Sequence, residues 1–240
     1  MESMDVEHLV LAAGRPPISE AISPGTIVGL AGLDGHGQEA FLETLAGRHR
    51  PAAGRIAIGN AQIDSSRAAT RAGIVYLPKD RRKTGIFPNL SVLDNFAIAS
   101  VAADRAGPWL SFKRRRARYE RFREQLSIVA DTPNGSITRL SGGNQQKVLL
   151  ARLLARGPSV LLLNDPTRGV DIATRHVLYG VFRRLAAEGM TVVLLSSEIE
   201  EVVELCDPIL VFREGHLSAR LSRGDRTSER VIAAMFGQPV

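Results

Sequence analysis

GLAGLDGHGQEAFLETLAG, residues 29 to 47, decides the fold of this chain. It continues a short apolar run, TIVGLAG (26 to 32), which is typical of a strand buried on both faces. Glycines follow at the spacing Gly32-x-x-Gly35-x-Gly37, and QEAFLETLAGR then has the pattern of a helix. A strand, a glycine-rich turn and a helix in this order predict a βα unit within a mostly parallel sheet.

The rest of the chain repeats this alternation of apolar runs and helical patterns. SVLLLN (159 to 164) and TVVLLSS (191 to 197) predict two more central strands, and the fold class is therefore α/β with a mostly parallel core sheet. Two other segments, RIAIGNAQI (55 to 63) and PILVFREGHLSAR (208 to 220), contain turn pairs and predict antiparallel hairpins. From about 91 to 137 the sequence is helical and basic, which we interpret as a helical subdomain inserted into one domain spanning 1 to 240.

Composition limits the class of protein. With 240 residues, 44% hydrophobic and 23% charged, the chain can build one ordinary core. No apolar run approaches the roughly 18 to 20 residues that a bilayer span needs, and the acidic start MESMDVEHLV does not have the pattern of a leader, which favours a soluble, cytosolic protein. The single cysteine, Cys206, excludes an internal disulfide framework and is expected in the core.

The net charge of +6 is concentrated in two short stretches. KRRRARYERFRE (113 to 124) holds much of it, and RRK (81 to 83) adds more. The first stretch predicts a solvated helix that packs through Phe112, Tyr119 and Phe122. No nucleic-acid-binding signature accompanies the charge, so we expect no nucleic-acid partner.

The glycine-rich turn has the geometry of a phosphate-binding loop, because it can aim backbone N–H groups and a helix N-terminus at an anion. It fits G-x-x-x-x-G-K-[ST], except that Gln38 replaces the lysine and Glu39 replaces the metal-binding hydroxyl. On this segment alone, a nucleotide site and a purely structural turn are both open. His36, like His49 and His216, is also compatible with a surface or turn position. The candidate cofactor-binding residues here are Gly32, Gly35, His36, Gly37, Gln38 and Glu39.

A stronger pattern lies further along the chain. LSGGNQQKV (140 to 148) precedes the helical LLARLLAR, the strand VLLLN and then DPTRGVD (165 to 171). This ordered set resembles the ATP-binding cassette of transporters. With the later SSEIEEV (196 to 202), it is most similar to the second cassette of ATPases that serve bacterial sugar importers of the ribose, galactose and xylose type. The resemblance covers about Val10 to Gly237.

In such cassettes two units face each other head to tail, and the signature of one closes over the nucleotide held by the other. The resemblance implies that Ser141, Gly142 and Gly143 contact the γ-phosphate in the partner's site. The alternative for Ser141 is a plain helix cap. Asp171 resembles the residue that crosses this interface, and it is also a candidate helix N-cap; the two roles are compatible.

Several positions depart from the family pattern. Asp165 stands where a glutamate usually activates water, and Ser197 takes the place of a histidine, so these two residues are the candidate catalytic residues. Asn164 stands where an aspartate usually holds magnesium, and Lys79 stands where a glutamine or glutamate touches the metal. The N-terminal region through Ile22 has no aromatic residue to stack on adenine. We expect both the affinity for the metal and the rate of ATP hydrolysis to be lower than in the family. Asn164 and Lys79 are the degenerate metal positions.

The resemblance therefore implies the regulatory or weakly active half of an importer ATPase, with ATP and Mg²⁺ bound weakly if at all. Its expected partners are a second cassette, a transmembrane permease facing the surface from about Lys79 to Trp109, and indirectly a periplasmic or extracellular sugar-binding protein. Its expected place is the cytoplasmic side of the inner membrane. The alternatives are a catalytically dead scaffold for the permease, or an importer of nucleosides or a signalling sugar. Soluble cassette ATPases of DNA repair or translation fit less well, because no long coiled coil, zinc-binding cysteines or tandem cassette is visible.

Overall fold

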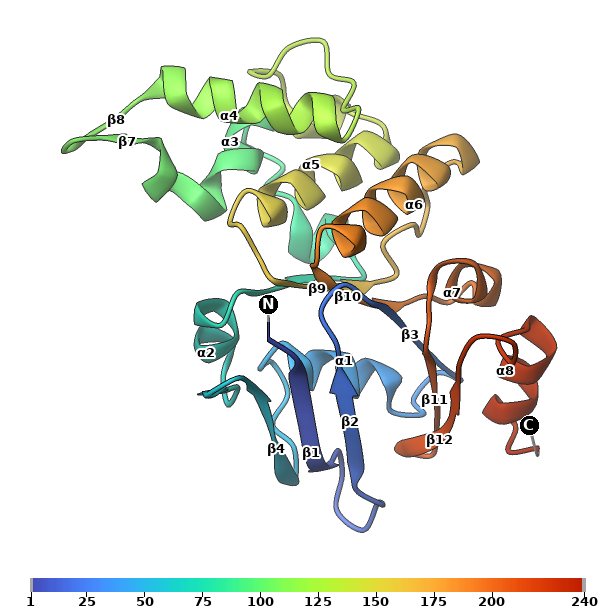
Figure 1. Ribbon diagram of the computed structural model, residues 1–240. Helices are drawn as coiled ribbons and strands as arrows, with labels where there is room; N and C mark the ends of the chain where they lie inside the picture. Colours follow the sequence, from blue (N-terminus) through green and yellow to red (C-terminus); the bar gives the residue numbers. More distant parts are fainter. Residues whose placement is uncertain (1, 239–240) are drawn as a thin grey trace. The chain divides into compact units, whose positions relative to one another are not determined.

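The computed structural model describes residues 2 to 238, and its chain divides into two compact units (Figure 1). The first comprises Met1–Tyr76, Ser159–Asp165 and Phe182–Val240, and the second comprises Leu77–Pro158 and Pro166–Val181. The single domain with an inserted helical subdomain therefore stays a prediction. None of the helices formed by residues 2 to 238 has both the length and the apolar character that crossing a bilayer requires.

A six-stranded sheet in the order β12-β11-β3-β10-β9-β6 forms the centre of the first unit. β11, β3, β10 and β9 pair in parallel, and β12 pairs antiparallel with β11. All residues of β9 and β10 are buried, which explains their continuous apolar sequences and confirms the predicted central strands. The bounds are β3 (Ile27–Gly32), β6 (Ile74–Leu77), β9 (Val160–Asn164), β10 (Thr191–Leu195), β11 (Ile209–Arg213) and β12 (His216–Leu221).

A second, antiparallel sheet in the order β2-β1-β4-β5 belongs to the same unit. The predicted hairpins are confirmed, with β4 and β5 joined at Gly59 and β11 and β12 joined at Glu214. Both turn residues have positive φ, of 54° and 49°, as tight hairpin turns require. The strands are β1 (Met4–Val10), β2 (Ile18–Ile22), β4 (Ala53–Ile58) and β5 (Ala61–Gln62).

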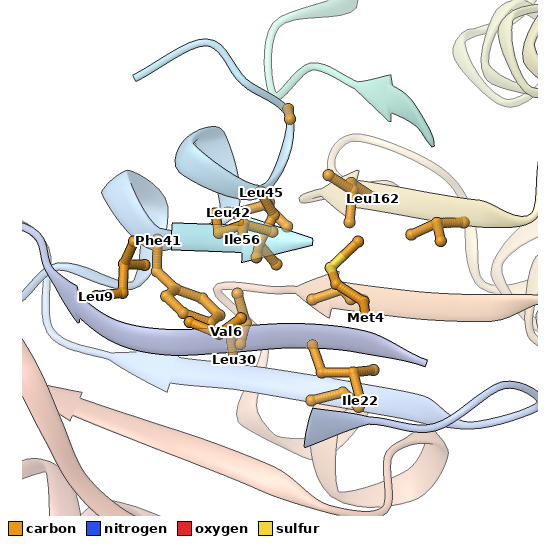
Figure 2. Close-up of a cluster of buried hydrophobic side chains, with 14 of the residues drawn as sticks. Met4, Val6, Leu9, Ile22, Leu30, Phe41, Leu42, Leu45, Ile56 and Leu162 are labelled. Atoms are coloured by element: carbon orange, nitrogen blue, oxygen red, sulfur yellow. The ribbon is translucent and has the colours of Figure 1, made fainter. Parts of the chain in front are cut away.

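The core of the first unit joins side chains of both sheets to α1 (Gln38–Leu45), as Figure 2 shows. Phe41 of α1 packs against Phe212 of β11 with ring centroids 5.1 Å apart. Met4 of β1 and Leu162 of β9 are fully buried in the same cluster. Cys206 is buried, as expected. The other helices of this unit are α2 (Ser66–Arg71), α7 (Ile199–Leu205), α8 (Ser228–Met235) and the last part of α6 (Ile172–Ala187).

The second unit is helical. Phe96 of α3 contacts Tyr119 and Phe122 of α4 at centroid distances of 5.7 and 5.6 Å, so the basic helix does pack through two of its predicted aromatic residues. The prediction for Phe112 is wrong: this residue is 72% exposed, because it opens α4 two turns before Tyr119. The main elements are α3 (Val92–Ala97), α4 (Phe112–Gln125), α5 (Gly142–Leu154), the first part of α6, and a hairpin of β7 (Arg105–Ala106) and β8 (Trp109–Leu110) that we did not predict.

Two phenylalanines of α4 provide a matched stability test. Phe122→Ala should lower the free energy of unfolding by about 3 kcal/mol, because its buried ring leaves a cavity beside Phe96. Phe112→Ala should change it by less than about 0.5 kcal/mol, because that ring is exposed. Urea or thermal unfolding followed by circular dichroism measures both. Equal losses would mean that α4 does not pack as described.

Candidate functional site

The glycine-rich loop turns sharply between β3 and α1. His36 donates its backbone N–H to the Leu33 carbonyl at 2.9 Å, and the His36 carbonyl accepts from Gly215 in the β11–β12 turn at 2.9 Å. Gly37 caps α1 with φ of 106°, a left-handed conformation that favours glycine. A side chain at Gly37 would also approach Gly215 to 3.0 Å. His36 is half-buried in this turn, where the loop packs on the neighbouring hairpin.

Gln38 fills the inside of the loop instead of extending from it. Its side chain is 5% exposed, and Nε2 donates to the carbonyls of Gly32 at 3.1 Å and Leu33 at 2.9 Å. A Cβ at Gly32 would lie 2.7 Å from the Gln38 Oε1, so this close approach requires a glycine. Both amide hydrogens of Gln38 are therefore committed to the loop itself. In this conformation Gln38 does not supply the neutral donor to a phosphate that its position suggested.

The end of β9 is joined to α1 by a side-chain hydrogen bond. Asn164, 1% exposed, donates from Nδ2 to Glu39 Oε1 at 2.9 Å and to the Tyr76 hydroxyl at 3.1 Å. Its Oδ1 atom is buried and has no hydrogen-bond partner within residues 2 to 238. Burial raises the pKa of Tyr76, so this hydroxyl stays protonated and neutral at physiological pH.

These residues do not fit a magnesium ion. Mg²⁺ requires oxygen ligands in a near-octahedral arrangement, whereas Asn164 turns an N–H donor towards the Glu39 carboxylate. The amide–carboxylate bond links Asn164 to Glu39, the residues at two positions where we expected metal contacts to be degenerate. Across the described part of the chain, no three His, Cys, Asp or Glu side chains gather as a metal cluster either.

The two predicted catalytic residues, Asp165 and Ser197, lie together. Asp165 Oδ1 accepts from the Ser197 backbone N–H at 2.6 Å, and the Asp165 N–H donates to the Leu195 carbonyl at 2.8 Å. Asp165 is 6% exposed and has φ of 47°, a left-handed conformation that costs free energy for a residue with a side chain. The parallel pairing of β9 and β10 produces this juxtaposition, because Leu195 is in register with Asn164.

Ser141 and the glycines after it lie in the second unit, at the start of α5. Ser141 is exposed and caps the helix: its Oγ accepts from Asn144 N at 3.3 Å and from Asn144 Nδ2 at 3.1 Å. Asn144 in turn accepts from Val129 N through Oδ1 at 2.9 Å, which fixes its amide. The alternative role of Ser141 as a helix cap is thus present, and Ser141 itself is exposed at this helix N-terminus.

Asp171 caps the following helix of the same unit. Its Oδ1 accepts from Thr174 N at 2.9 Å, and this backbone hydrogen bond lowers the pKa of the exposed carboxyl. Thr174 lies close to α5, because a Cβ at Gly143 would meet the Thr174 side chain at 2.9 Å. Small residues at the start of α5 therefore allow the two helix starts to approach closely.

A basic cavity of about 430 Å³ lies beside this part of the second unit, with Lys79 among its lining residues. Arg81 closes one side by donating to the carbonyls of Arg168 at 2.8 Å and Gly169 at 3.4 Å. A Cβ at Gly142 would lie 2.5 Å from the Arg81 guanidinium. Arg81 thus connects the segment after β6 to both the start of α5 and the loop before α6. The cavity is lined by Lys79, Asp80, Arg81, Arg168 and Gly169.

Comparison with known proteins identifies the family. The model of the ABC transporter family matches residues 16–168, more than half of the chain. The chain belongs to the ABC transporter family. Its fold is that of an ABC cassette, a mixed and mostly parallel sheet with antiparallel strands and helices.

Curated relatives of this cassette are named as import proteins. A putative ribose/galactose/methyl galactoside import ATP-binding protein of Agrobacterium fabrum is 38% identical over 90% of this chain and 44% of its own length. The autoinducer 2 import ATP-binding protein LsrA of an Enterobacter species is 39% identical over 92% of this chain and 44% of its own. A ribose import ATP-binding protein of Caldanaerobacter subterraneus is 33% identical over 98% of this chain and 48% of its own length. The chain spans about half the length of the curated relatives it matches.

Solved structures of cassettes share the fold at lower identity. A dimer of the ATP-binding cassette MJ0796, in a post-hydrolysis state bound to ADP and Pi, superposes with a TM-score of 0.77 at 21% identity, covering 91% of this chain and 98% of that one. A chain in the structure of an inward-facing conformation of a putative metal-chelate type ABC transporter has a TM-score of 0.78 at 23% identity, covering 99% of this chain and 90% of that one.

The ABC cassette divides its candidate residues between the two units. The first unit brings together the glycine-rich loop, Asn164, Asp165 and Ser197, and the second holds Lys79, Ser141 and Asp171 with the signature glycines. Sequence reasoning missed Tyr76 and Asn144, each of which positions one of these side chains. It also missed Arg81, although the basic stretch at 81 to 83 was noticed. The assignments of individual residues to nucleotide, metal or catalysis stay predictions.

Restoring the family residues should strengthen MgATP binding. The triple variant Gln38→Lys, Glu39→Thr, Asn164→Asp replaces the internal hydrogen bonds by a cation, a hydroxyl and a carboxylate suited to MgATP. With MgATP at 100 times its dissociation constant, the variant should gain about 2.7 kcal/mol of stability, measured as a thermal shift. The unmodified chain should show no shift that depends on Mg²⁺.

The control replaces the same three residues by alanine, which breaks the hydrogen bonds of Gln38 and Asn164 without supplying ligands. It should give no MgATP shift. If the unmodified chain is stabilised by MgATP as strongly as the triple variant, then the internal bonds do not close the site.

Proposed function

We propose that this chain is a nucleotide-binding cassette of a sugar-type ABC importer, corresponding to the second cassette of such ATPases. Its own phosphate loop and strand ends are degenerate, and its signature completes the ATP site of a partner cassette. The names of the relatives support the importer class, because the similar proteins of Agrobacterium fabrum and Caldanaerobacter subterraneus are named as sugar import ATP-binding proteins.

One contrast carries the proposal. In the first unit, Gln38 and Asn164 hydrogen-bond to neighbouring protein groups at the positions where phosphate and metal contacts are expected. In the second unit, Ser141 lies exposed at the N-terminus of a 13-residue helix, followed by two glycines. An exposed serine at a helix N-terminus is suited to contact an anion, whereas Gln38 in the loop before α1 is buried and bonded to its own loop.

The partners follow from this role. Two cassettes would close head to tail on ATP, and the closure would drive a permease through a binding-linked shift between conformations. We place the chain at the cytoplasmic side of the inner membrane, with a periplasmic or extracellular sugar-binding protein as an indirect partner. The surface from about Lys79 to Trp109 would face the permease.

The proposal gives the cargo only as a class, a sugar-type molecule. Relatives of similar identity are named for ribose or galactose, for arabinose and for autoinducer 2, so the cassette sequence does not discriminate among cargoes. In the proposed importer, the binding protein and the permease would make that choice.

The loop before α1, in which Gln38 hydrogen-bonds to the loop's own carbonyls, also fits a second function. In that function the chain is a scaffold that supports the permease and never takes part in ATP chemistry. The two functions differ at Ser141: a scaffold does not need its hydroxyl or the glycines after it, whereas a cassette that completes a partner's site does.

Isolated from any partner, the chain should hydrolyse MgATP far below the roughly 1 to 100 turnovers per second typical of phosphoryl-transfer enzymes such as kinases. The reason is that Gln38 and Glu39 replace a cation and a metal-binding hydroxyl. Phosphate release from the purified chain measures the rate. A turnover within the typical range would contradict the degenerate site.

In the importer assembled with its permease, Ser141→Arg should lower ATP hydrolysis about 100- to 1,000-fold, although the partner cassette is unchanged. A bulky cation at this helix start blocks the approach to the Gly142 and Gly143 amides and removes the hydroxyl. Gln38→Ala should have little effect, because Gln38 donates to its own loop. The measurement is the ATPase rate in proteoliposomes.

Ser65→Arg is the matched control. Ser65 is likewise an exposed helix cap, accepting from Ala68 N at 3.2 Å at the start of α2, but it lies outside the signature. It should leave the ATPase rate unchanged. Normal hydrolysis by the Ser141→Arg importer would favour the scaffold, and equal losses from Ser141→Arg and Ser65→Arg would trace the defect to the lost cap.

A further inference from the structure

The β7–β8 hairpin presents an unusual group of apolar side chains. Trp109, Leu110 and Phe112 are 77%, 47% and 72% exposed, and all three lie within four consecutive residues. Within the second unit, the hairpin extends beyond the helices that precede and follow it (Figure 1). Large apolar side chains exposed as a contiguous group, with polar residues around them, mark a surface that contacts another molecule.

The hairpin is fixed to α4 by buried polar groups. Asp104, fully buried, accepts from Arg115 Nε at 3.0 Å and also from Arg118. Its carbonyl accepts from the Ser111 backbone N–H at 2.9 Å, and Arg114 donates to the Arg105 carbonyl. These bonds hold the two ends of the hairpin on the first turns of the helix. The apolar tip is therefore presented in a defined position, so little ordering cost is expected on binding.

The surroundings of the tip are cationic. Arg105 on the hairpin and four side chains of α4 are exposed, whereas Glu120 of the same helix is half-buried and pairs with Arg123. The exposed acidic residue of α4 is Glu124, in its last turn. Cations thus outnumber acidic groups beside the aromatic residues. The exposed basic residues of α4 are Lys113, Arg114, Arg116 and Arg121.

We propose that this hairpin–helix surface, Arg105 to Arg121, binds an anionic lipid headgroup layer. A projecting tip of Trp, Leu and Phe can enter the boundary between headgroups and acyl chains, while the surrounding Lys and Arg groups attract the phosphates. Tryptophan suits this boundary, because its ring is apolar and its N–H remains polar. A protein partner would need a cavity that matches the tip, whereas a lipid layer adapts to it. The surface is separate from the nucleotide chemistry proposed above. Its residues Arg105 to Trp109 also end the segment that we proposed to face the permease, and we assign this end of that segment to the lipid instead.

The chain contains one tryptophan, Trp109, which makes its fluorescence a direct reporter of the tip. Vesicles of phosphatidylcholine containing phosphatidylglycerol should bind the chain and shift its emission to shorter wavelength, as the indole leaves water. Vesicles of phosphatidylcholine alone should do neither. Raising the salt concentration should weaken binding, because exposed charges are screened.

The variant Lys113→Glu, Arg116→Glu should weaken binding to the anionic vesicles by at least about tenfold, since each basic group near such a surface contributes a factor of roughly five. Neither side chain holds the hairpin in place. The control Arg67→Glu, Arg71→Glu makes the same change of charge on exposed residues of α2. It should bind normally. Phe112→Ser should reduce binding without changing its dependence on salt.

Three outcomes would overturn the proposal. One is equal binding to neutral and anionic vesicles, or none to either. Another is an equal loss from both charge-reversal pairs, which would reflect net charge alone. The third is unchanged vesicle binding by Lys113→Glu, Arg116→Glu together with lost assembly on the permease, which would assign this surface to a protein partner.

Discussion

Parallel pairing of β3, β10 and β9 is the constraint on which the rest of the first unit depends. Because the three strands run the same way, their carboxyl ends lie at one edge of the sheet, where the loop after Gly32, the Asn164–Asp165 pair and Ser197 all emerge. In the observed register Leu195 lies beside Asn164, so the polar residues that follow β9 and β10 emerge next to each other. This edge of the sheet is therefore polar, because the residues that follow the apolar strands gather there.

Three residues at this edge differ from the family pattern, and their charges and hydrogen bonds are compatible with one another. Glu39 lies in the first turn of α1, where the helix dipole favours a carboxylate. An aspartate at position 164 would place a second carboxylate beside it, and without a metal the two would repel each other. Asn164 removes that repulsion and donates a hydrogen bond instead. Gln38 likewise satisfies the loop carbonyls that it approaches. Gln38 therefore bonds to its own loop, and Asn164 and Glu39 bond to each other, so all three replacements have hydrogen-bond partners within the protein.

The sequence predicted the elements whose pattern is strong and missed those whose pattern is mixed. The continuous apolar runs at 26 to 32, 159 to 164 and 191 to 197 gave the central strands, because burial on both faces leaves no polar position in them. β1, with the sequence MDVEHLV, mixes charged and apolar residues, and we did not predict it. Phe112 has the spacing of a packed aromatic residue, but α4 begins there and the ring remains exposed. The short hairpin of β7 and β8 was also missed, although Gly107-Pro108 between its strands is a turn pair.

The sequence predicted which residues occupy the candidate site, but not which hydrogen bonds their side chains make. Motif spacing locates Gln38, Asn164 and Ser141, yet the direction of each side chain depends on groups that local sequence does not identify. Tyr76, which accepts from Asn164, is 88 residues away in the chain. For Gln38, the deciding acceptors are two backbone carbonyls, which have no sequence signature. Spacing therefore establishes which residues meet, and only the folded chain shows whether they face a ligand or one another.

The structural role of Ser141 as a helix cap is compatible with the role that we propose for it at a partner's ATP site. A serine hydroxyl has two acceptor lone pairs and one donor hydrogen. Asn144 uses the acceptor side through its backbone N–H and its Nδ2, at 3.3 and 3.1 Å. The hydroxyl hydrogen is not used by these two bonds, so it is available to another acceptor. Helix capping and the proposed phosphate contact are therefore compatible roles for Ser141.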